Sequence, residues 1–170
     1  MNQAHLHLLL NHFPVIGTIL CLLLLLAAIL RKSHELKRIS LAALVLIALL
    51  AIPAYLTGEP AEDIVENIPG VSKALIEPHE EAALAAIISM SVTGIFALFG
   101  LIWVRGKKSF PSWIMTAALL LTAVSVGLMA QTANLGGKIH HPEISGVSTT
   151  APAEGGGENK SENKKKHDDD

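Results

Sequence analysis

The chain has 170 residues, of which 51% are hydrophobic and 16% are charged, and its formal net charge is −2. Soluble domains carry about 25% charged residues, and here the apolar residues form long runs, which is typical of an integral membrane protein. The sequence has no phosphate-binding loop, dinucleotide fingerprint, nucleophile elbow or nucleic-acid-binding motif, so we expect no autonomous catalytic activity and no nucleic-acid partner. The single cysteine, Cys21, excludes an internal disulfide, and no C-x-x-C-H motif is present for covalent haem.

Four apolar runs approach the ~20 residues that a helix needs to cross a bilayer. They comprise residues 13–30, 39–56, 82–104 and 111–135. These runs predict an all-α, four-helix transmembrane bundle that forms one domain, residues 1–144, surrounded by membrane lipid. Residues 145–170 are rich in Gly, Ser, Glu, Asn and Lys, and a segment of that composition cannot bury a core, so we expect a disordered polar tail.

Basic residues in the short loops predict the orientation of the bundle. Residues 31–38 include four lysines and arginines and residues 105–108 include three, whereas the segment before the first run has none. Because basic loops stay in the cytoplasm, we expect both termini on the outer side, which is the periplasmic side of a bacterial inner membrane. Seven of the eight histidines then lie outside, and only His34 lies in the cytoplasm.

The first run is preceded by three histidines, His5, His7 and His12, and contains Pro14 near its start. If the helix begins before His5, then His5 and His12 share one stripe, while His7 and His12 differ by about 140°. If instead Pro14 breaks the helix near Phe13, the preceding segment folds over the bundle. In both cases His12 is expected to lie deepest in the membrane.

The segment between the second and third runs combines acidic and apolar residues. Residues 62–68 and 71–76 each place apolar side chains on one helical face, so they predict two short amphipathic segments over the outer mouth; a solvated loop is the alternative. Pro78 followed by Glu80 and Glu81 predicts the start of the third helix. That helix-start pattern does not account for His79. Below His79 runs a stripe of small and medium residues: Ala83, Ala86, Met90, Thr93, Gly94 and Ala97.

The fourth run becomes polar toward its outer end. Gln131 and Asn134 are placed to hydrogen-bond and orient a ligand histidine, because costly polar groups in a membrane usually face the bundle interior. Gly136 and Gly137 predict the end of the helix. His140 and His141 then follow just outside it, as ligands or as parts of an exposed loop.

The motif H-x-x-x-x-H-F-P at His7–Pro14 resembles the opening of a bacterial family of four-helix membrane proteins that is catalogued as a domain of unknown function. The resemblance extends over residues 5–145 and includes T-G-E-P at Thr57–Pro60, a histidine before two glutamates at His79–Glu81, and Gly136–Gly137. Relatives in that family are sometimes fused to c-type cytochrome domains, which implies a redox setting. The resemblance also implies the same four-helix architecture for this chain.

The histidines support three hypotheses for function. The first is a b-type haem protein for electron transfer, with His12 and His79 as the axial pair and with His7 and His140 or His141 at a second haem. The second is a non-haem copper or zinc protein, whose ligands come from His5, His7, His12, His79 and Glu80. The third is a structural small subunit. Expected partners are a periplasmic cytochrome or a respiratory-complex subunit.

Overall fold

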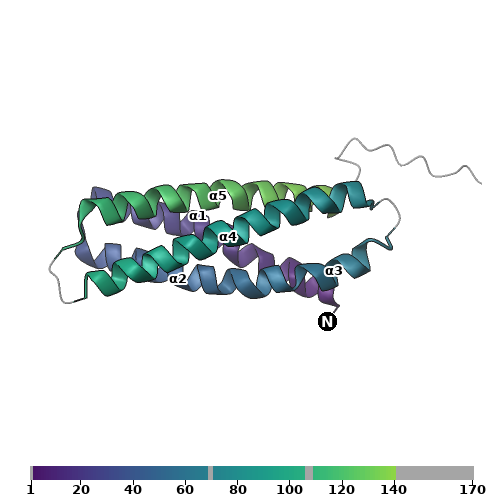
Figure 1. Cartoon of the computed structure of the whole chain (residues 1–170), viewed down its shortest axis with the longest axis horizontal. Helices are drawn as coiled ribbons and strands as arrows, with labels where there is room; N and C mark the ends of the chain where they lie inside the picture. Colours follow the sequence, from purple (N-terminus) through teal and green to yellow (C-terminus); the bar gives the residue numbers. More distant parts are fainter. Residues whose placement is uncertain (1, 69–70, 106–108, 141–170) are drawn as a thin grey trace, which may run out of the picture.

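The computed structural model describes residues 2–68, 71–105 and 109–140, and this part of the chain is all-helical (Figure 1). The long helices are α1 (Gln3–Leu30), α2 (His34–Leu56), α4 (Lys73–Trp103) and α5 (Ser112–His140); the short α3 (Gly58–Val65) follows α2 after one residue. Within these described ranges, four helical segments are long and apolar enough to cross a membrane. The all-α, four-helix prediction is thereby confirmed, while the predicted tail, residues 145–170, lies outside the described residues.

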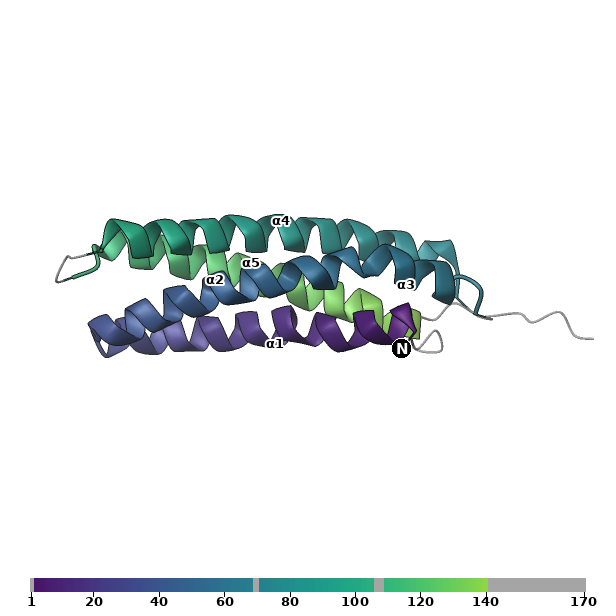
Figure 2. The ribbon, with the colours of Figure 1, turned by 90° about the horizontal axis from the view of Figure 1, so that it is seen from below.

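The long helices form a closed four-helix bundle with short connections. α1 packs against α2 and α5, and α4 packs against the same two helices, so α1 and α4 are diagonal partners (Figure 2). Successive long helices alternate in direction, and α1 and α4 therefore run parallel. We call the end where α1 and α4 begin the histidine end, because it holds His5, His7, His12 and His79. The opposite end, with residues 31–38 and Arg105, is the basic end.

Apolar side chains cover both the inside and the outside of the bundle. Leu25, Leu41 and Ile114 are fully buried at its centre. On the outer faces, Ile95 and Leu120 remain 69% and 62% exposed. A helix that is apolar on all sides requires an apolar surrounding, so these outer faces fit contact with lipid chains.

Small residues let the helices approach closely at mid-bundle. The α4 stripe predicted from the sequence is largely buried: Ala86, Met90, Thr93, Gly94 and Ala97 face the interior. A Cβ atom on Gly94 would collide with the Ala48 methyl group of α2. Close packing of this kind replaces the hydrophobic effect as the main attraction between helices in lipid.

Hydroxyl groups join α4 to α5 beside this stripe. The Ser125 hydroxyl lies 2.9 Å from the hydroxyls of both Ser89 and Thr93. The Thr93 and Ser125 hydroxyls also bond the carbonyls of Ser89 and Leu121 in their own helices. In an apolar interior such hydrogen bonds satisfy polar groups that would otherwise be costly.

Several helix boundaries differ from those expected. α1 begins at Gln3 and continues through Pro14 without a break. The predicted start of the third long helix at Pro78 is wrong, because α4 begins at Lys73; Ile76, which is only 3% exposed, docks this added turn on the bundle. Pro78 lies in the second turn of α4 and lacks the N–H that would bond the Ala74 carbonyl, so it costs the helix this hydrogen bond. Of the two predicted amphipathic segments, the first (residues 62–68) overlaps only the end of α3, which runs from Gly58 to Val65, and the second (residues 71–76) includes the first turn of α4.

Candidate functional site

A contact at mid-bundle sets the register of the diagonal helices α1 and α4. The Thr18 hydroxyl of α1 lies 3.6 Å from the Met90 sulfur of α4. His7 precedes Thr18 by eleven residues, and His79 precedes Met90 by eleven. Eleven residues make about three helical turns, or about 16 Å of helix. Because the two helices are parallel, His7 and His79 lie at the same height along the bundle. Both are also on the side of their helix that faces the bundle axis, as Thr18 and Met90 are.

His7 and His79 accordingly form a pair at the histidine end. Both imidazoles are partly buried, and each lies near enough to the other for a direct electrostatic interaction. The Nδ1 atom of His7 is 3.2 Å from the Thr57 hydroxyl, which follows the last residue of α2, and the Ala54 carbonyl also borders this ring. The Nδ1 atom of His79 is 3.0 Å from the Thr132 carbonyl of α5. The two rings and their hydrogen-bonding partners therefore come from α1, the end of α2, α4 and α5.

A hydrogen bond to a carbonyl selects the tautomer of the His79 ring. The Thr132 carbonyl can only accept, so His79 Nδ1 must carry a proton. The Thr57 hydroxyl has one proton, which it can donate to the Pro53 carbonyl at 2.9 Å or to the Ala54 carbonyl at 3.0 Å. With the proton directed at one of these carbonyls the hydroxyl accepts from His7 Nδ1–H, and with the proton directed at His7 Nδ1 it donates, so both tautomers of His7 fit this bond. In the neutral His79 ring, with its proton on Nδ1, the lone pair is on Nε2, which is the arrangement of metal-ligating histidines whose other nitrogen is held by an oxygen.

Gly136 serves this site and does not end a helix. The prediction that Gly136 and Gly137 terminate the last helix is wrong, because α5 continues to His140. A Cβ atom on Gly136 would lie 3.1 Å from Cε1 of His79, whereas a Cβ atom on Gly137 would have no neighbour within 4 Å. The missing side chain of Gly136 therefore lets the His79 ring lie directly against the α5 backbone.

The other residues singled out in the sequence lie elsewhere at this end. His5, His12, Gln131 and Asn134 are exposed, and the His12 Nδ1 atom bonds the Leu8 carbonyl of its own helix. Glu80 is exposed and lies near the carboxyl group of Glu62 on α3. The side chain of His140 and all of His141 fall outside the described residues. Within the described ranges, no three histidine, cysteine or acidic side chains converge as a metal-ligand group.

His34 lies at the basic end. Its ring centroid is 5.0 Å from that of Phe110, at an interplanar angle of 41°. Its Nδ1 atom is buried, and no hydrogen-bond partner for it is found among the described residues. His34 is therefore a packed histidine on the opposite side of the apolar belt from the His7–His79 pair.

The position of His7 on the inner face of α1 could have been recognised from the spacing of buried residues in the sequence. Pro14, Cys21 and Ala28 follow His7 at intervals of seven residues, and all three are buried in the bundle. His7 begins this buried stripe, while His12 is turned away from it by about 140°.

No protein-family model matches the chain, and no curated protein or solved structure is significantly similar to it.

Proposed function

We propose that the histidine end binds one b-type haem between His7 and His79, and that the protein transfers electrons within a membrane. The observation that carries this proposal is the pair of imidazoles on diagonal helices, each with its Nδ1 atom hydrogen-bonded to an oxygen of a neighbouring helix segment. A low-spin haem takes two axial ligands, and two histidines in a helical bundle supply them. This assignment replaces His12 with His7 in the axial pair inferred from the sequence.

The surroundings of the pair are compatible with a flat apolar cofactor. Four buried alanines lie toward this end of the bundle, together with the larger Ile76 of α4: Ala54 of α2, Ala61 of α3, and Ala82 and Ala86 of α4. The bound haem would supply one-electron chemistry. The chain would supply the two ligands, their orientation through Thr57 and Thr132, and exclusion of water by the apolar bundle. The cations at this end of the described chain are Lys73 and Lys138, which are candidates to pair with haem propionates.

The cellular setting belongs to the same proposal. The basic loops 31–38 and 105–108 favour a cytoplasmic basic end. The histidine end would then face the periplasm of a bacterial inner membrane, with both termini outside. Electrons would be exchanged there with a periplasmic cytochrome or with a subunit of a respiratory complex. A copper ion held by the same two imidazoles is the alternative cofactor, because imidazole also suits copper.

A visible absorption spectrum of the full chain tests the haem assignment. The chain is produced in cells supplied with a haem precursor, purified in mild detergent, and compared with His7→Ala, His79→Ala and the matched variant His12→Ala. We expect a Soret band and a sharp reduced α band in the native protein and in His12→Ala. Each of the other two variants should lose the α band while its far-ultraviolet circular dichroism stays helical.

Three results would contradict the assignment. A colourless native protein would exclude haem, and metal analysis of that sample would then distinguish copper from an unliganded structural subunit. Loss of the α band in His12→Ala but not in His7→Ala would restore His12 as the ligand. An intact spectrum in the double variant His7→Ala/His79→Ala would place the haem elsewhere in the protein.

A further inference from the structure

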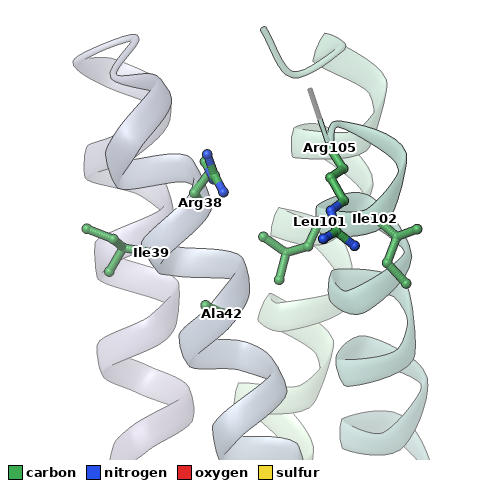
Figure 3. A pocket seen from close by; sticks show the side chains of 6 residues that line it. All are labelled: Arg38, Ile39, Ala42, Leu101, Ile102 and Arg105. Carbon is green, nitrogen blue, oxygen red and sulfur yellow. The ribbon is translucent and has the colours of Figure 1, made fainter. Parts of the chain in front are cut away.

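A groove opens between α2 and α4 at the basic end, far from the histidine pair (Figure 3). Its volume is about 460 Å³, and its lining comprises Arg38, Ile39, Ala42, Leu101, Ile102 and Arg105. Arg38 lies on α2, and Arg105 follows the last turn of α4 on the other side of the groove. The groove therefore combines two guanidinium groups with four apolar side chains.

The two arginines have no protein anion to neutralise them in the described part of the chain. Both are exposed, and neither guanidinium forms an ion pair or hydrogen bond with another described residue. The sequence of the two basic segments, residues 31–38 and 104–112, contains one acid, Glu35, against seven lysines and arginines. This end of the bundle thus presents a positive field in which an anion is strongly favoured.

The apolar lining of the groove is continuous with the lipid-facing surface. Ile39 and Ile102 are 50% and 63% exposed, so the apolar belt of the bundle extends directly into the groove. Ala42 contributes only a methyl group to one wall, which leaves width for a hydrocarbon chain between α2 and α4. A free inorganic anion would use the arginines but would leave these apolar walls without a partner.

We propose that the groove binds one anionic phospholipid from the surrounding leaflet. The lipid phosphate lies between Arg38 and Arg105, and one acyl chain runs along Ala42 and Leu101. Guanidinium groups present paired N–H donors that match phosphate oxygens. Basic pockets between transmembrane helices are also a recognised type of site for anionic headgroups. The site is independent of the proposed haem, which would lie at the other end of the bundle.

Lipid binding to the purified full chain tests this site. Binding of phosphatidylglycerol and phosphatidylcholine with the same acyl chains is measured by native mass spectrometry from detergent. We expect the native chain to prefer phosphatidylglycerol by about tenfold or more, because phosphatidylcholine carries the same phosphate but its choline cation is repelled by the positive field of the basic end. Arg38→Gln/Arg105→Gln should abolish the preference. Arg31→Gln, which removes a charge at the same end but outside the groove, should retain it.

A second variant tests the apolar part of the groove without changing any charge. Ala42→Phe should weaken binding of phosphatidylglycerol about as much as the arginine double variant, because the aromatic ring fills the path of the acyl chain. Thermal unfolding of each variant in lipid-free detergent confirms that the bundle is intact. A folded Ala42→Phe variant that still binds phosphatidylglycerol normally would overturn the proposed position of the acyl chain.

Other outcomes would also overturn the proposal. An equal loss of preference in Arg31→Gln would indicate a diffuse charge effect and no defined site. Displacement of the lipid by millimolar inorganic phosphate would indicate an anion site that does not use the apolar walls. A native dimer that dissociates in Arg38→Gln/Arg105→Gln would identify the occupant of the groove as a second copy of the chain.

Discussion

Two oxygens hold the rings of the histidine pair in place. Thr57 presents its hydroxyl to His7 from the end of α2, where the same hydroxyl caps free carbonyls of the last turn. Thr132 contributes its backbone carbonyl to His79. Gly136, one turn further along α5, leaves this carbonyl open to a neighbouring ring because it has no side chain. Neither oxygen belongs to Gln131 or Asn134, the residues expected to orient a ligand.

Gly136→Ala is predicted to impair the cofactor site without removing a ligand. The new methyl group would lie 3.1 Å from the His79 ring, which must move by a few tenths of an ångström, and this movement would weaken its bond to Thr132. Loss of such an orienting contact weakens metal affinity by about 10- to 100-fold, which haem titration of the apoprotein would measure. Gly137→Ala, whose methyl group meets nothing within 4 Å, is the matched control and should bind normally. Equal effects from both variants would refute the role assigned to Gly136.

At the level of helices, the bundle depends on close approach at a few small residues. α2 and α4 touch at Ala48 and Gly94, where even one added methyl group has no space. The Ala48 side chain is itself a single methyl group, so it cannot rotate out of the way. The helices themselves would have to separate, which would also strain the hydroxyl contacts of Thr93 with Ser125.

Gly94→Ala is therefore predicted to destabilise the folded bundle. Overpacking of a tight interface costs about 1–3 kcal/mol, and denaturation in mixed detergent micelles would measure the loss. Gly127→Ala on α5 is the control, because its methyl group would have no neighbour within 4 Å. Its stability should stay the same or rise by up to about 1 kcal/mol, since alanine favours the helix over glycine. A stable Gly94→Ala variant would contradict the packing described for α2 and α4.

The molecule as a whole is chemically polarised along the bundle axis. One end carries the paired histidines, and the other carries the basic segments and the Arg38–Arg105 groove. An apolar belt separates the two ends, so a redox site at one end and a lipid-headgroup site at the other would face different leaflets. The basic segments predict the direction of this polarity in the cell.

Reporter fusions test the proposed orientation of the molecule. An alkaline phosphatase fused after Asp170 should be active, because this enzyme requires the oxidising periplasm to form its disulfides. The same reporter fused after Ser109, at the basic end, should be inactive. The reverse pattern would place the histidine end in the cytoplasm and would exclude a periplasmic electron partner.

The architecture could be predicted from local composition. Each span needs only enough consecutive apolar residues, and the buried stripe of α4 follows from helical spacing alone. Helix ends were less predictable, because Pro78 and Gly136 are common boundary residues that here lie within helices. Burial of Ile76 and the approach of the His79 ring, both tertiary contacts, override these local preferences.

The choice of His7 over His12 depended on the fold. A sequence places both residues near the same end, but it does not show which face of α1 meets the diagonal helix α4. The contact between Thr18 and Met90 sets that register, and it joins residues far apart in the chain. The same holds for the hydrogen-bonding partners Thr57 and Thr132, which come from helices other than those of their histidines. Apolar length is a local property, whereas the register between helices arises only when their side chains pack.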